Sequence, residues 1–343
     1  MNAQSTDSAR LAEASDAGPA PRRSRPGLAT AVPALVCLVI VAVLFAMPQM
    51  LATTSLLNLQ SAIGLALFAC ATNLLVGYGG LVSFGQAAFY GVGAYTIALA
   101  WLHWQISFWL GFVAAPFVGA VAALLVGLVA LRTRRLYFSL LTLAASQLFY
   151  VVVLQQTGFT GGANGVFGPM LPAWLLDLSH AYYFTLAVTV VALLLLWQIT
   201  RSPFGQTLRA IRENRERAEA LGINVFAHQL LAFVFAGAFC AIAGSLFVVH
   251  DQSANPDLLA WTQSGYPIFM AIIGGQFTFL GPALGALIYE QSRDVLLSNF
   301  ADWRMVFGAL LLVIVLFAPE GLLGLPARVR GLAGRVRREG RRR

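Results

Sequence analysis

Long apolar stretches separated by short polar segments dominate the chain. Stretches of this length are typical of membrane-spanning helices, since a span needs about 20 apolar residues. No Asp, Glu, Lys or Arg occurs between Gly27 and Leu131, which leaves room for about four such helices. The predicted spans cover residues 28–48, 54–76, 82–101, 108–131, 136–155, 182–199, 229–249 and 303–319.

A further apolar region, 263–297, is harder to divide. Its first half, 263–277, would be about 22 Å long as a helix at 1.5 Å per residue, and Gly274 and Gly275 then interrupt it. We expect both ends of the region on the outer side, so it crosses twice or re-enters as a hairpin. The predicted fold class is therefore all-α: a polytopic transmembrane bundle of about 8–10 spans with broken or re-entrant helices.

Composition and charge support a membrane protein. Hydrophobic residues make up 59% of the chain and charged residues 10%, against about 25% charged in soluble domains. The basic residues gather beside the predicted spans, where they indicate cytoplasmic loops and contact with lipid headgroups instead of nucleic acid. We expect a disordered cytoplasmic tail (1–27), a transmembrane domain (28–319) with a cytoplasmic loop (200–228), and a basic cytoplasmic tail (320–343), so that both termini are cytoplasmic.

Two glycine-rich segments are candidates for a solute pathway. The first, 77–86, can form a broken helix that turns backbone groups into a pathway, or only a small-residue packing face. The second, 157–165, can line the entrance or meet an external partner, or be an ordinary surface turn. The candidate pathway residues are Gly79, Gly80, Ser83, Gln86, Thr160, Gly161, Gly162 and Asn164.

The longest charged connection, 202–222, predicts one cytoplasmic helix. Ser202 can cap it, Pro203 suits its first position and Gly222 can end it. The segment can be a partner-docking helix or a solvated linker. Its sequence contains three possible i, i+4 ion pairs and a narrow apolar stripe: Arg209–Glu213, Arg212–Glu216 and Arg215–Glu219, with Leu208, Ile211, Ala218 and Leu221.

Several functional classes are excluded by missing residues. The chain contains no lysine, so it has no P-loop to bind ATP. Apart from Glu290, its acidic residues fall near predicted span ends or outside the spans, which disfavours proton or sodium coupling through the membrane interior. The His and Cys residues show no metal-ligand spacing and no catalytic group is evident. We expect no enzyme activity, no metal and no cofactor in this chain.

Six motifs in order resemble the LivM-type permeases of branched-chain amino-acid ABC importers, which are related to the LivH type. The resemblance covers about residues 50–325. The motifs are NLLVGYGGLVSFGQAAFYGVGAYT, LYFSLLTLAASQLFY, TGGANGVFG, SPFGQTLRAIRENRERAEALGIN, AIAGSLF and FGALLLVIVLFAPEGLLG.

The resemblance implies a permease subunit in the bacterial inner membrane that moves Leu, Ile and Val into the cytoplasm. Urea or short-chain amides are the alternative solutes, and a secondary transporter is the alternative class. The implied partners are a LivH-like permease, two cytoplasmic ATPase subunits that use the ATP, and a periplasmic solute-binding protein. The implied ATPase-coupling residues are Leu208, Arg209, Ile211, Arg212, Glu213, Asn214, Glu216, Glu219, Leu221 and Gly222.

Overall fold

The computed structural model describes residues 43–49, 52–133, 135–168, 170–300, 302–317 and 321–322. The chain divides into two units, Met1–Met50 and Leu51–Arg343. In the first unit the described residues include the short 3-10 helix η1 (Met47–Gln49). The predicted tail 1–27, nearly all of the tail 320–343 and most of the span 28–48 lie outside the described residues.

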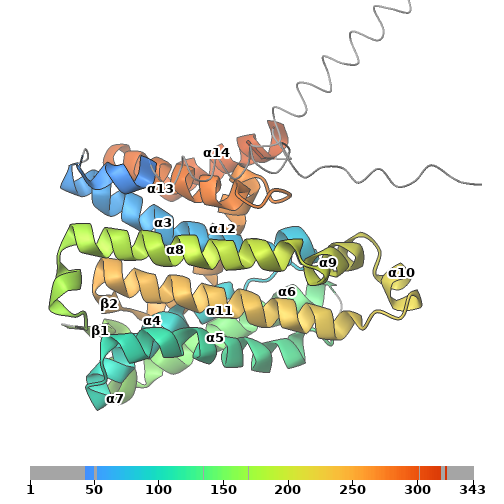
Figure 1. Cartoon of the computed structure of the whole chain (residues 1–343), viewed down its shortest axis with the longest axis horizontal. Coiled ribbons are helices and arrows are strands. Elements are labelled where there is room, and N and C mark those ends of the chain that lie inside the picture. The colour runs from blue at the N-terminus through green and yellow to red at the C-terminus, as the bar shows by residue number, and fades with distance from the viewer. Residues whose placement is uncertain are drawn as a thin grey trace, which may run out of the picture. The chain divides into compact units, whose positions relative to one another are not determined.

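The second unit is helical almost throughout (Figure 1). Five of its described helices are long and apolar enough to cross a membrane, which confirms the predicted class of polytopic helical bundle. The longer helices are α3 (Thr53–Asn73), α4 (Gln86–Trp104), α5 (Phe108–Ala130), α6 (Arg135–Gln155), α8 (Leu178–Arg201), α11 (Val225–Asp251), α12 (Trp261–Gly274), α13 (Gly281–Asn299) and α14 (Trp303–Phe317).

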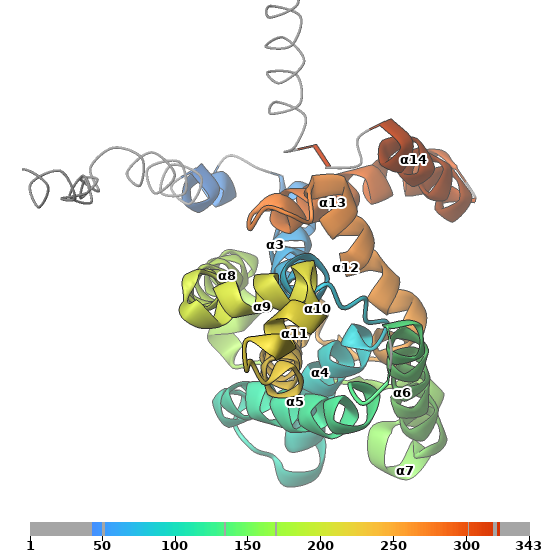
Figure 2. The ribbon, with the colours of Figure 1, turned by 90° about the vertical axis from the view of Figure 1, so that its right-hand side faces the viewer.

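Within this unit α3, α4 and α11 form the centre (Figure 2). Most of α3 and α11 is buried, whereas most of the residues in the apolar windows of α5, α6 and α8 are at least partly exposed. Phe117 of α5 and Leu136 of α6 are examples of these exposed side chains. An exposed apolar surface of this kind suits lipid or another membrane subunit, because neither solvates it with water.

The central helices cross at very short distances because glycine stands at the contacts. A Cβ on Gly93 of α4 would lie 2.0 Å from the carbonyl oxygen of Ala241 in α11, and one on Gly244 of α11 would lie 1.8 Å from that of Tyr90 in α4. Small residues allow helix backbones to approach closely in a membrane. Gly93 and Gly244 are therefore packing positions of the α4–α11 contact.

Most predicted spans agree with the helices, but the third is displaced. The span 54–76 corresponds to α3 continued by a π-helical turn, η2 (Leu74–Gly79). The span predicted at 82–101 begins only at Gln86, because residues 80–85 are not helical. The glycines that suggested a broken helix lie in this interruption.

The region 263–297 folds as a hairpin of two helices, α12 and α13. As predicted, the break falls at Gly274 and Gly275; Gly275 has φ +119°, which favours glycine. A Cβ on Gly274 would lie 1.7 Å from the carbonyl oxygen of Gly281, so the two arms of the hairpin meet closely. The hairpin packs against α3.

The connection between α6 and α8 lies at one end of the bundle. It contains α7 (Thr157–Thr160), η3 (Gly162–Asn164), β1 (Val166–Phe167) and η4 (Ala173–Leu176). The strand β1 pairs antiparallel with β2 (Ser253–Ala254), which η5 (Pro256–Leu259) follows. At the start of α8, Asp177 accepts a hydrogen bond of 2.8 Å from the backbone N of Ser179, which lowers the pKa of the Asp177 carboxyl.

We expect Gly244→Ala to destabilise the protein, because its methyl group would overlap the backbone of α4. Overpacking of this kind costs about 1–3 kcal/mol, so the apparent melting temperature of the purified chain should fall by several degrees. Gly308→Ala in α14 is the control, since a Cβ there meets nothing within 4 Å. Equal melting temperatures for the two variants would contradict the close α4–α11 crossing.

Candidate functional site

The charged segment after α8 forms two helices instead of the single one predicted. These are α9 (Pro203–Glu213) and α10 (Arg215–Ala220). Asn214 between them is extended, with φ −154° and ψ 101°, and its Oδ1 accepts a hydrogen bond of 2.9 Å from the backbone N of Arg217. Asparagine often caps a helix because its short side chain satisfies a free backbone N–H. The prediction of a continuous helix is therefore wrong, and Asn214 causes the break.

The predicted ends of this segment are partly confirmed. Pro203 is the first residue of α9, and Gly222 follows α10 with φ +82°. Ser202 occupies the N-cap position of α9 as predicted, but its hydroxyl makes no capping bond and donates instead to the carbonyl of Ile199 at 2.7 Å.

Of the three predicted ion pairs, the structure contains Arg215–Glu219 at 2.9 Å. Arg212 and Glu216 lie on different helices because of the break at Asn214, so they no longer share one helix face. The guanidinium carbon of Arg209 lies 4.6 Å from the centre of the Tyr78 ring, which is a cation–π contact with η2.

One face of α9 and α10 packs against the rest of the bundle. Leu208 and Ile211 are almost completely buried, and Ala218 packs with Ile211 and Val225. Burial of these apolar side chains fixes the segment in place. Leu208 and Ile211 are thus unavailable to a partner, and of the predicted apolar stripe Leu221 alone is exposed.

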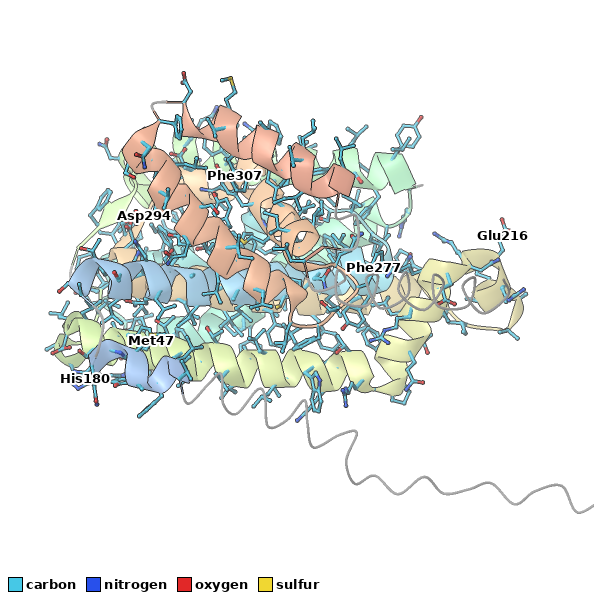
Figure 3. All side chains as sticks on the ribbon, turned by 90° about the horizontal axis from the view of Figure 1, so that it is seen from above. Met47, His180, Glu216, Phe277, Asp294 and Phe307 are labelled. Carbon is cyan, nitrogen blue, oxygen red and sulfur yellow. The ribbon has the colours of Figure 1, made fainter. Side chains whose placement is uncertain are left out.

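The opposite face is charged and exposed. The two helices extend beyond the ends of the long helices (Figure 1), and Figure 3 shows Glu216 pointing away from the bundle. A rigidly held, charged projection is suited to binding another protein. Its exposed polar residues are Gln206, Arg209, Glu213, Asn214, Arg215, Glu216, Arg217 and Glu219.

Arg212 connects this projection to two other elements. Its guanidinium lies 4.6 Å from the ring centre of Phe277, in the turn between α12 and α13, and it donates a hydrogen bond to the carbonyl of Gly77 in η2. A Cβ on Gly80 would lie 2.8 Å from Cγ of Arg212, so the chain after η2 also needs glycine there. Arg212 therefore ties α9 to η2 and to the α12–α13 hairpin.

The predicted pathway residues Gly79 and Gly80 line a small cavity beside Arg212. Its volume is about 40 Å³, whereas a water molecule occupies roughly 30 Å³ in the liquid. The cavity can hold water but is too small for an amino acid.

The non-helical segment 80–85 is held by hydroxyl groups of α6. Ser139 Oγ donates a hydrogen bond of 2.6 Å to the carbonyl of Val82, and Thr142 Oγ1 accepts one of 3.2 Å from the backbone N of Phe84. A third hydroxyl of α6, Ser146 Oγ, donates a hydrogen bond of 2.8 Å to the carbonyl of Leu259 in η5. None of these three residues was among those predicted from the sequence. Their spacing of three and four along an apolar helix places them on one face and is the signal that could have revealed them.

Ser83 and Gln86 are completely buried and contact each other. Ser83 Oγ accepts from Gln86 Nε2 at 3.3 Å, and Gln86 Oε1 accepts from Cys240 Sγ at 3.3 Å. In this conformation their polar atoms stabilise the start of α4 and its contact with α11.

The second group of predicted pathway residues lies at the other end of α4. Thr160 Oγ1 donates a hydrogen bond of 2.8 Å to the carbonyl of Gln156. Gly161 and Gly162 have positive φ angles, and the side chain of Asn164 is exposed. The carbonyl of Phe159 lies 2.7 Å from Nε2 of His103 near the end of α4. Since α4 is about 28 Å long at 1.5 Å per residue, the structure does not bring the two groups together.

Glu290 is the membrane carboxylate that the sequence singled out. It is buried in α13, and one of its oxygens lies 3.2 Å from the guanidinium of Arg293. The Arg293 guanidinium offsets its charge, as expected for a carboxylate buried in an apolar bundle.

The fold and the charged projection together define a helical membrane protein that carries an exposed, charged pair of helices at one end. The chain belongs to the family described as the permease component of the branched-chain amino acid transport system, whose model matches residues 53–316. This confirms the resemblance found in the sequence.

Individual relatives agree with the family. The chain is 27% identical over 279 residues to the high-affinity branched-chain amino acid transport system permease protein LivM of Escherichia coli K12 and 26% identical to that of Salmonella typhimurium. Each alignment covers 73% of this chain and 65% of the relative. It is also 28% identical over 286 residues to E. coli K12 LivH, covering 76% of this chain and 91% of LivH. No solved structure matches the chain.

We expect Arg212→Ala to loosen α9 from the bundle, because it removes a cation–π contact and a hydrogen bond. Together these contribute about 1–2 kcal/mol, so amide hydrogen exchange in α9 should accelerate about 5- to 30-fold. Arg215→Ala is the control, since Arg215 pairs with Glu219 at the exposed surface. Unchanged exchange in α9 of Arg212→Ala would show that Arg212 does not hold the segment.

Proposed function

We propose that this chain is the membrane-spanning permease subunit of an ABC importer for branched-chain amino acids. It moves leucine, isoleucine and valine from the periplasm to the cytoplasm of a bacterium across the inner membrane. The family and the names of its relatives support the solute class. The observation that carries the importer role is the α9–α10 segment, which is packed on one face and charged on the other.

The energy for transport enters through separate subunits in this proposal. The chain has no lysine for a P-loop, and the carboxylate of Glu290 is held by Arg293. Two cytoplasmic ATPases therefore bind and hydrolyse the ATP, and α9–α10 docks on them. A LivH-like permease completes the membrane part, and a periplasmic binding protein delivers the solute.

The contact with the ATPases is formed by the exposed charges of α9 and α10. Leu208 and Ile211 support the contact from inside the bundle, because they are buried under it. Arg212 has a second role, since it reaches both η2 and Phe277. Glu213, Glu216 and Leu221 remain candidates for direct contact with the ATPase.

The proposed topology places α9–α10 in the cytoplasm and the end of the bundle that contains β1 and β2 outside. Basic residues at Arg132 and in α9–α10 then lie on the cytoplasmic side, as positive-inside bias requires. The α12–α13 hairpin begins and ends outside, with Gly274 and Gly275 toward the cytoplasm. Both chain termini are cytoplasmic.

We expect Glu213→Lys to weaken ATPase docking without reducing the amount of folded permease. Glu213 is exposed and the structure records no hydrogen bond or ion pair for its carboxylate, whereas a charge misplaced at a protein interface costs several kcal/mol. Recovery of ATPase with the tagged permease and leucine uptake in cells should both fall at least ten-fold. Asp302→Lys, which reverses an exposed charge at the other end of the bundle, is the control. Wild-type uptake and recovery for Glu213→Lys would remove the argument for docking at this face.

The topology predicts opposite labelling of two introduced cysteines. Asn299→Cys, at the end of α13, should react with a membrane-impermeant thiol reagent in intact spheroplasts. Glu216→Cys, in α10, should react only after the membrane is permeabilised. Labelling of both cysteines from the same side would contradict the proposed topology.

A further inference from the structure

A second cavity, of about 230 Å³, lies at the end of the bundle opposite α9 and α10. Figure 3 places Asp294, the neighbour of Arg293 in α13, toward this end and Glu216 at the other. The walls come from α3, α4, α11, α12 and α13, and no sequence motif predicted their meeting. The polar lining residues are Gln60, Ser61, Tyr90, His250, Gln263, Tyr266, Tyr289 and Arg293.

Two polar atoms of the lining have no hydrogen-bond partner in the described structure. They are Oε1 of Gln60, a residue only 1% exposed, and Nδ1 of His250. The side-chain amide of Gln60 is nevertheless held in position, because its Nε2 donates a hydrogen bond of 3.3 Å to Thr185 Oγ1 of α8. Leaving a buried polar atom unpaired is costly, so such an atom needs a ligand or water to explain it.

The cavity also has a charged group that can recognise an anion. Arg293 uses one nitrogen for Glu290 and its side chain is 44% exposed, so other donors of its guanidinium remain free to bind. A planar guanidinium matches a carboxylate with two parallel hydrogen bonds. The pairing with Glu290, whose Oε2 lacks a hydrogen-bond partner, keeps the net charge of this wall near zero.

The remaining wall is apolar. Leu65 and Phe68 of α3 and Leu246 and Phe247 of α11 line it. The volume corresponds to several water molecules at roughly 30 Å³ each. An apolar wall opposite a cation and an unpaired acceptor fits a small molecule with a carboxylate, an ammonium group and a hydrocarbon side chain.

We propose that this cavity is a solute-binding site of the permease and that it takes an α-amino acid with an aliphatic side chain. Arg293 binds the carboxylate, Oε1 of Gln60 accepts a hydrogen bond from the ammonium group, and Phe68, Leu246 and Phe247 contact the side chain. The assignment rests on the proposed function and deepens it. In the proposed topology the cavity receives the solute from the periplasmic side.

Protection of a cysteine tests the site directly in the assembled transporter. The full complex is reconstituted with Cys37, Cys70 and Cys240 replaced by serine, and Ser61→Cys is introduced in the cavity lining. Leucine with its binding protein should slow the reaction of this thiol with a small methanethiosulfonate several-fold. Ser107→Cys, an exposed position at the start of α5, should react at the same rate with and without leucine.

Two variants test the recognition chemistry. The double variant Arg293→Gln/Glu290→Gln removes both charges together, so it leaves no unpaired charge behind. It should abolish the protection and reduce leucine uptake at least ten-fold, with normal permease abundance and ATPase recovery. Gln60→Leu should reduce uptake about ten-fold, as expected for the loss of a hydrogen bond to a charged group. Solute affinity of the isolated binding protein should not change.

The outcomes separate this inference from the proposed function. If the wild-type complex imports leucine but neither the protection nor the losses are seen, the cavity is not the solute site and the importer role stands. An unreactive Ser61→Cys in an active complex overturns the site equally. A wild-type complex that imports urea or a short amide and not leucine overturns both proposals.

Discussion

Inside an apolar bundle every backbone N–H and C=O group must find its hydrogen-bond partner within the protein. Helices meet this requirement by themselves, but residues 80–85 do not form one. Their backbone is satisfied instead by Ser139 and Thr142 of α6, together with the N–H of Leu81, which donates to the carbonyl of Leu75 at 2.9 Å. These bonds allow the chain to continue from η2 as a non-helical segment and to enter α4, which packs against α11.

This requirement also positions the α9–α10 segment. The π-helical turn η2 ends the long helix begun by α3, and its Gly77 carbonyl accepts the hydrogen bond from Arg212. Since Leu208 packs beside Gly79, both the polar and the apolar attachment of α9 depend on the shape of η2. The charged projection is thus attached at the π-helical turn that follows α3.

The helical class and most spans could be predicted because they follow from local apolar length. The hairpin break at Gly274 and Gly275 could also be predicted, since glycine favours the backbone angles found there. The break at Asn214 was missed because its flanking residues favour a helix, and the cap that interrupts them depends on one side chain. The start of α4 was misplaced for a different reason: the partners of residues 80–85 are in α6, and no local pattern shows them.

In the candidate sites, too, features that depend on local sequence were predicted and features that depend on contacts between distant segments were not. The α9–α10 segment is continuous in the sequence, so its position and charge were predicted, although the buried face of α9 was not. The residues Ser83 and Gln86 were chosen for their polarity and prove to satisfy each other inside the bundle. The cavity at the other end draws Gln60, His250 and Arg293 from three helices. Residues so far apart in the chain form no motif, and only the fold brings them together.

One continuous helix has a mechanical consequence. Thr53–Gly79 extends through α3 and η2 over 27 residues, about 40 Å at the usual rise. Gln60 lies about a quarter of the way along this helix, and Gly77, whose carbonyl accepts the hydrogen bond from Arg212, lies near its other end. A displacement of α9 therefore acts on the cavity wall through one continuous helical segment, with no loop between them.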